Sequence, residues 1–111
     1  MANMTDILLV FSTFPDLDKA RHTGTLIVES QLAACVNLCP NLESIYRWKG
    51  AVETSNEVLA IFKTTVQTYP ALEQRLRELH PYEVPEIIAL PAAQASAAYA
   101  QWIMQEVRTE S

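Results

Sequence analysis

The sequence predicts a mixed α+β fold with the order strand, helix, strand, strand, helix, strand, helix. Short segments with a continuous or alternating apolar pattern, typical of strands, are followed by segments whose apolar residues recur at helical spacing. Proline or glycine lies at the junctions. Half of the 111 residues are hydrophobic, which is enough for a buried core. We therefore expect one domain spanning residues 1–111.

The first strand and the first helix are expected near the N-terminus. Residues 6–12 form a nearly continuous apolar run, which is typical of a strand covered on both faces. Pro15 and Asp16 then begin a helix that runs to about residue 32, because apolar and small side chains recur at helical spacing. His22 falls on the opposite side of this helix and is predicted to be solvated.

A long β-hairpin is predicted next. From Ala33 the pattern favours strands, with a break at Pro40, and residues 42–49 alternate between two faces. Gly50 makes the turn, and residues 51–66 return as a second long strand. Arms of this length exceed the usual strand of about five or six residues, so they expose edges that a second subunit often covers.

A second helix is expected over residues 69–79, with Pro70 in its first turn and a favourable Glu73–Arg77 pair. Pro81 ends it, because the residue before a proline is pushed out of helical geometry. His80 is therefore expected at the exit of this helix.

The last two elements are a strand and a helix. Residues 86–91 form a short apolar run, and Ser96 can cap a final helix. The inner side of that helix is expected to hold Tyr99, Trp102, Ile103 and Val107. The whole order matches a split β-α-β, ferredoxin-like arrangement with an added C-terminal helix.

Composition excludes several classes of protein. A net charge of -5 and a pI near 4.9 argue against nucleic-acid binding, which needs clustered lysine and arginine. The first residues offer no basic region, and the apolar run that follows is too short for a signal core or a membrane span. We expect a cytoplasmic protein without a membrane partner.

Catalytic motifs are missing from the sequence. Two glycines, far apart, cannot form a glycine-rich phosphate loop, a dinucleotide fingerprint or a nucleophile elbow. Neither histidine belongs to a recognisable triad. The sequence therefore favours a protein that is not an enzyme.

Cys35 and Cys39 are predicted to be small, buried, reduced thiols. Four residues apart on a strand, at about 3.3 Å per residue, they would lie roughly 13 Å apart. That separation is too large for a disulfide or a shared metal ion. The alternative is Cys35 acting alone as a soft ligand beside residues from elsewhere in the fold.

Lys63 alternates with Leu59 and Ile61, so it is expected on their partly buried face. It would need a carboxylate partner, for which Glu57, Glu83 and Glu86 are the candidates, or else it binds an anionic ligand. Five aromatic residues are expected to pack in the core or at an interface, with an aromatic-walled cleft as the alternative. They are Tyr46, Trp48, Tyr82, Tyr99 and Trp102.

Five segments, in order and in one register from about residue 6 to 108, carry a family resemblance. They read LAACVN (32–37), SIYRWKG (44–50), EVLAIFKTT (57–65), LHPYEVPEIIALP (79–91) and YAQWI (99–103). Together they closely resemble the CutA family of divalent-cation tolerance proteins.

The resemblance implies a ferredoxin-like subunit in a tight homotrimer, with long hairpins crossing between subunits and sheets facing inward. It implies a cytoplasmic protein associated with copper tolerance and the response to divalent metals, without an established enzymatic activity. The trimer would also explain the long hairpin arms.

The resemblance also implies metal ligands. Some family members have a cysteine at the position of Ser12 and a His-His pair before the Pro-Tyr, whereas this chain has Ser12 and Leu79 there and keeps His80. We expect copper, or another divalent cation, to bind His80 together with carboxylates such as Glu83 or Glu86.

The alternative function is a small-ligand sensor, or a regulatory or docking scaffold. It would use clefts between subunits, as trimeric PII-type signalling proteins do. The candidate cleft residues are Cys35, Trp48, Glu57, Lys63 and Tyr82.

Overall fold

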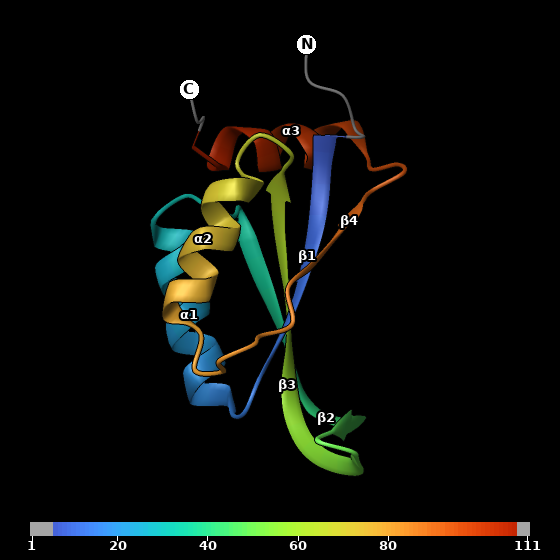
Figure 1. The fold of residues 1–111 in the computed structure, drawn as a ribbon. Helices are drawn as coiled ribbons and strands as arrows, with labels where there is room; N and C mark the ends of the chain where they lie inside the picture. The colour runs from blue at the N-terminus through green and yellow to red at the C-terminus, as the bar shows by residue number, and fades with distance from the viewer. Residues whose placement is uncertain (1–5, 109–111) are drawn as a thin grey trace.

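The computed structural model describes residues 6–108, and residues 1–5, which entered the argument about a signal segment, lie outside this range. Seven elements follow the predicted order (Figure 1): β1 (Ile7–Phe14), α1 (Leu17–Glu29), β2 (Cys35–Trp48), β3 (Ala51–Thr65), α2 (Tyr69–Leu79), β4 (Ile88–Pro91) and α3 (Ala97–Glu106). The strands form one antiparallel sheet in the order β2-β3-β1-β4. Since β3 lies between β1 and β2, the β-α-β unit is split, and the predicted α+β order is confirmed.

Some predicted boundaries change. β1 extends to Phe14, because Thr13 and Phe14 still pair with β3, and α1 ends at Glu29, after which Gln31 adopts a φ of 61°. The predicted break at Pro40 is an interruption within one strand: β2 continues through it, but its pairing with β3 shifts register between Cys39 and Leu42. A proline is tolerated there because β2 is an edge strand, and an irregularity absorbs its missing N–H group.

The main core lies between one face of the sheet and helices α1 and α2 (Figure 1). Every second residue of β3 from Val58 to Thr64 is buried, as the two-residue period of a strand requires. Gly24 brings α1 close to β2, because a Cβ atom there would lie 3.0 Å from Cγ1 of Val36. No helix among the described residues is long and apolar enough to span a membrane.

Helix α3 forms a second, smaller core at one end of the sheet. Ala100, Ile103 and Val107 pack there with Ile7 and Ala34. The prediction that Tyr99 and Trp102 also face inward holds only for the Tyr99 hydroxyl, which reaches Lys63 and Cys35 of the sheet; the two residues are 40% and 38% exposed. Positions 100, 103 and 107 share one side of a helix, so positions 99 and 102 turn toward the neighbouring side.

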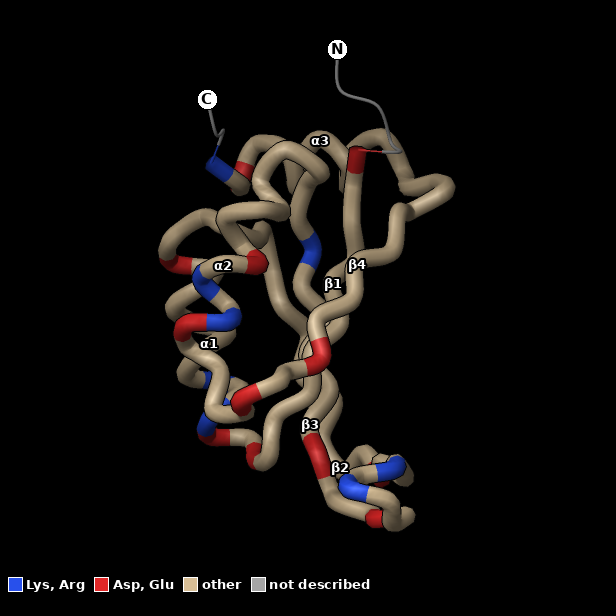
Figure 2. The backbone as a smooth tube through the Cα atoms, in the orientation of Figure 1, with Lys and Arg blue, Asp and Glu red and all other residues tan. Residues whose placement is uncertain are grey.

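The other face of the sheet is apolar and largely uncovered beyond α3; we name it the open face. Its members alternate with the core residues of β1, β3 and β4. They are Leu9, Phe11, Leu59, Ile61, Ile88 and Leu90. Ile88 and Leu90 are 53% and 44% exposed. Figure 2 shows that charged residues gather on α1, α2 and the hairpin end, while the centre of the sheet carries few.

The hairpin of β2 and β3 projects past the rest of the molecule (Figure 1), which has a longest dimension of 48 Å. Its end exposes large hydrophobic side chains, among them Ile45 at 67% and Val52 at 65%. Large exposed hydrophobic side chains rimmed by charged ones, on a hairpin that continues an uncovered sheet face, are typical of a protein–protein contact.

Candidate functional site

His80 lies where the sequence predicts, at the end of α2, but the fold buries it against β1. Its backbone N–H donates to the carbonyl of Leu76 and its side chain is 8% exposed. The ring stacks on Phe14, with 4.4 Å between ring centroids. This stacking depends on β1 extending to Phe14, beyond the predicted end of the strand.

Both ring nitrogens of His80 are engaged. Nε2 lies 2.8 Å from the carbonyl oxygen of Thr13, and Nδ1 lies 3.1 Å from the backbone nitrogen of Tyr82. A carbonyl can only accept and an amide N–H can only donate, so Nε2 carries the proton and Nδ1 accepts. These two hydrogen bonds favour the neutral imidazole, and they attach the turn of residues 80–82 to β1. A metal ion at either nitrogen would replace one of these hydrogen bonds.

Tyr82 connects the same turn to the hairpin. Its hydroxyl donates to Oε2 of Glu57 at 2.6 Å, and its ring lies 5.0 Å from that of His80 between centroids. Burial, and then the hydrogen bond to Glu57, raise the pKa of Tyr82 above its ordinary value. Two of the five predicted cleft residues, Glu57 and Tyr82, are thus brought together.

The predicted metal ligands Glu83 and Glu86 lie in the segment between this turn and β4, and both are exposed. Across residues 6–108, no three His, Cys, Asp or Glu side chains gather closely enough to hold a metal ion. His80, Glu83 and Glu86 therefore do not form a complete site within one chain.

Lys63 and Cys35 are cross-strand partners on β3 and β2, beside α3. Lys63 Nζ donates to the hydroxyl of Tyr99 at 3.1 Å and lies 5.4 Å from the centre of its ring. Cys35 Sγ lies 3.7 Å from the same hydroxyl. The hydrogen bond from Lys63 to Tyr99 is the main cause that raises the pKa of Lys63.

The structure corrects two expectations about this cluster. Among the described residues Lys63 forms no ion pair with Glu57, Glu83 or Glu86, because α3 packs against β3 and brings the Tyr99 hydroxyl to its Nζ. Cys35 is half-buried and Cys39 exposed, not buried as expected, because α3 covers only one end of this sheet face; both are free thiols. The fifth cleft residue, Trp48, lies apart at the hairpin end, 51% exposed, with Lys49 over its ring.

Sequence reasoning missed Thr13 and Phe14 as neighbours of His80. The predicted first strand ended at residue 12, and no local pattern indicates a contact between Thr13 and His80, 67 positions away. Ser12 was expected at the end of the first strand and, from the resemblance, at a position where some family members have cysteine. It is fully buried, and its hydroxyl finds no hydrogen-bond partner within residues 6–108.

The stability of the fold is expected to depend on pH through His80. Burial is the largest cause that lowers its pKa below the ordinary value near 6.5, although the Thr13 carbonyl and Glu57 act in the opposite direction. Between the folded pKa and about 6.5, the unfolded chain binds more protons, so stability falls as pH falls through this window. Denaturant unfolding at several pH values, compared with His80→Gln, measures this slope.

His80→Gln supplies the matched control, because a glutamine amide can still donate to the Thr13 carbonyl but does not titrate. The variant is expected to lose part of the slope below pH of about 6.5 and to leave the rest of the profile unchanged. An identical slope in both proteins would exclude His80 as its source.

Comparison with known proteins places this geometry in a family. The model of the CutA1 divalent ion tolerance protein family matches residues 8–106. The chain is 44% identical over 102 residues to a divalent-cation tolerance protein CutA of Thermus thermophilus, covering 92% of this chain and 97% of that protein. It is 46% identical to a human protein CutA, covering 91% of this chain but only 56% of the human protein.

Solved structures agree with the sequence comparison. The crystal structure of CutA from Xylella fastidiosa superposes with a TM-score of 0.90 at 40% identity, covering 93% of this chain and 99% of that one. The Thermus thermophilus structure gives a TM-score of 0.89 at 43% identity, covering 92% and 99%. With the fold and the sequence in agreement over nearly all the described residues, the chain belongs to the CutA1 divalent ion tolerance protein family.

Proposed function

We propose that this chain is one subunit of a cytoplasmic, non-enzymatic homotrimer that binds divalent cations, copper in particular, in clefts between subunits. The observation that carries the proposal is the open face, an apolar sheet surface that α1 and α2 leave uncovered and that the hairpin extends. Copies of the same chain are the simplest partners for such a surface, since most soluble oligomers are homo-oligomers with closed symmetry.

The cation site is proposed to be completed by assembly. Glu83 and Glu86 are exposed carboxylates next to the edge strand β4, but the described residues of one chain supply no three-ligand group. A neighbouring subunit would provide the remaining ligands. His80 joins the set only if its ring exchanges the Thr13 or the Tyr82 hydrogen bond for the metal. The relatives' names support divalent cations as a class.

Copper titration against a competing chelator tests the site. Replacing Glu83 and Glu86 together by glutamine is expected to weaken Cu²⁺ affinity at least tenfold, since losing even an outer partner of a metal ligand costs about 10–100-fold. The matched control is Glu106→Gln, another exposed carboxylate, at the end of α3. Light scattering on the same samples checks that the variants keep the wild-type mass.

The possible outcomes separate assembly from metal binding. Wild-type affinity in the double variant would exclude these carboxylates as ligands, and wild-type affinity in a dissociated monomer would exclude a site between subunits. His80→Gln distinguishes a ligand from a residue that positions the turn: a ligand role predicts a loss of affinity like that of the double variant. A monomeric mass for the wild type at micromolar concentration would contradict the trimer.

A further inference from the structure

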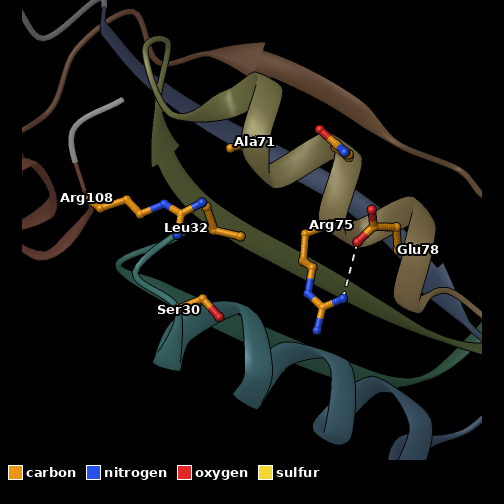
Figure 3. Close-up of a pocket in the computed structure, with 7 residues that line it drawn as sticks. Ser30, Leu32, Ala71, Arg75, Glu78 and Arg108 are labelled. Atoms are coloured by element: carbon orange, nitrogen blue, oxygen red, sulfur yellow. Dashed lines mark hydrogen bonds and ion pairs between the residues drawn. The ribbon is translucent and has the colours of Figure 1, made fainter. Parts of the chain in front are cut away.

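A polar pocket lies on the helical side of the sheet, opposite the open face. It lies among the end of α1, the outer side of α2 and the last described residues of the chain (Figure 3). Its volume of about 310 Å³ is at the lower end of the roughly 300–1,000 Å³ typical of small-ligand pockets. Five of its lining residues are polar or charged, namely Ser30, Gln74, Arg75, Glu78 and Arg108.

The position of Arg108 is determined by its own backbone. Its N–H donates to the carbonyl of Gln31 at 2.8 Å, and its carbonyl accepts from the hydroxyl of Thr68 at 2.8 Å. These two bonds attach the chain to the residues after α1 and before α2. Figure 3 shows the Arg108 side chain extending from this attachment toward Leu32, at one end of the pocket.

Arg75 enters from α2. Figure 3 shows its side chain reaching from α2 toward α1, and its Nη1 lies 3.2 Å from Oε1 of Glu78. Both side chains of this pair are about half exposed, at 45% and 51%, and exposed pairs contribute little to stability. An incoming anion can therefore replace Glu78 at small cost in free energy. The other N–H groups of the Arg75 guanidinium can donate to the same anion.

The charge of the pocket contrasts with that of the chain. Two arginines less one glutamate give the lining a formal charge of +1, whereas the whole chain carries -5. Guanidinium groups form paired hydrogen bonds to the oxygens of phosphate and carboxylate groups. Two such groups on separate elements, with polar Gln74 and Ser30 near them, suit a ligand with two anionic groups.

We propose that this pocket binds a small polyanion bearing phosphate or carboxylate groups, with Arg75 and Arg108 each holding one group and Glu78 acting as the competing carboxylate. A competing explanation is that the arginines only balance the negative end of α1, whose last turn contains no basic residue. The two explanations differ in what an added anion and the loss of Glu78 should do.

The test is a titration of the full-length protein with pyrophosphate and, separately, citrate, at low ionic strength, followed by amide chemical shifts. We expect saturable shifts at the end of α1, along α2 and at Arg108. Arg75→Gln should raise the dissociation constant about tenfold or more, because a hydrogen bond to a charged group is lost. Glu78→Gln should lower it several-fold, since the competing carboxylate is gone.

Arg77→Gln is the matched control. It removes the same charge from the same helix, and breaks a comparable exposed pair with Glu73 at 3.8 Å, but residue 77 does not line the pocket. Its affinity should equal that of the wild type. A tighter response to pyrophosphate than to citrate would assign phosphate groups to the ligand, and the reverse would assign carboxylates.

Three results would overturn the proposal. One is the absence of saturation by either probe up to about 10 mM. Another is an equal loss of affinity in Arg77→Gln and Arg75→Gln, which would mean diffuse attraction without a site. The third is unchanged or weaker binding in Glu78→Gln. Arg75→Lys keeps the charge but lacks the planar guanidinium, so it controls for a folding defect in Arg75→Gln. It should bind the anion more weakly than the wild type.

Discussion

Ile61→Asp is expected to convert the proposed homotrimer into monomers. Ile61 lies at the centre of the open face, paired across the sheet with Phe11, and its side chain alternates with the buried Phe62. In a trimer built on this face, three unpaired carboxylates would be buried at once, and each buried unpaired charge costs several kcal/mol. Light scattering at micromolar concentration measures the mass directly.

Two variants make this experiment interpretable. Thr25→Asp introduces the same charge on an exposed position of α1, on the other side of the sheet, and should leave the mass unchanged. Ile88→Asp places the charge on β4, at a side chain already 53% exposed in the single chain, so it should dissociate the trimer without unfolding the subunit. Trimeric mass in both open-face variants would place the subunit contact elsewhere.

His80→Ala is expected to lower the free energy of unfolding by about 2.5 kcal/mol or more. The change leaves the Thr13 carbonyl and the Tyr82 amide without their partners, and each unsatisfied buried group costs about 1–3 kcal/mol. It also removes the stacking on Phe14, worth about 0.5–1.5 kcal/mol. Denaturant unfolding at one fixed protein concentration measures the loss, because assembly adds to apparent stability.

The chain contains its own control for this measurement. His22 is the other histidine, and it is exposed on α1. His22→Ala is expected to change stability by no more than about 0.5 kcal/mol, as most surface substitutions do. Similar losses in the two variants would mean that the hydrogen bonds of His80 are not important for the fold.

Local sequence patterns predicted a helix or strand well where the spacing of apolar residues and the residues that form turns indicate the same boundaries. Residues 69–79 form a helix as expected, with the Glu73–Arg77 pair at 3.8 Å and His80 at its end. The hairpin turn at Gly50 is also confirmed, with a φ of 83° that glycine tolerates best. Such features depend on neighbours within a few positions, so they can be read without knowing the tertiary structure.

Predictions that depended on distant contacts were less accurate. Pro40 was expected to break a strand, but β2 lies at the edge of the sheet, where a proline and a register shift are tolerated. Tyr99 and Trp102 were expected on the inner side of α3, but they lie at its border, 40% and 38% exposed, because helical spacing does not give the width of the buried side. Lys63 was expected beside a carboxylate, but the packing of α3 on the sheet places it beside Tyr99.

The sequence by itself determined the α+β order, the helix that ends at His80 and the family to which the chain belongs. Only the tertiary structure decided the burial and the protonation of His80. Its partners Thr13 and Phe14 come from β1, and the proton on Nε2 is donated to a residue far away in the chain. Only the tertiary structure, likewise, placed Arg75 and Arg108 at one pocket. Periodicity specifies which side of an element is apolar, whereas sheet order and register specify which side chains meet.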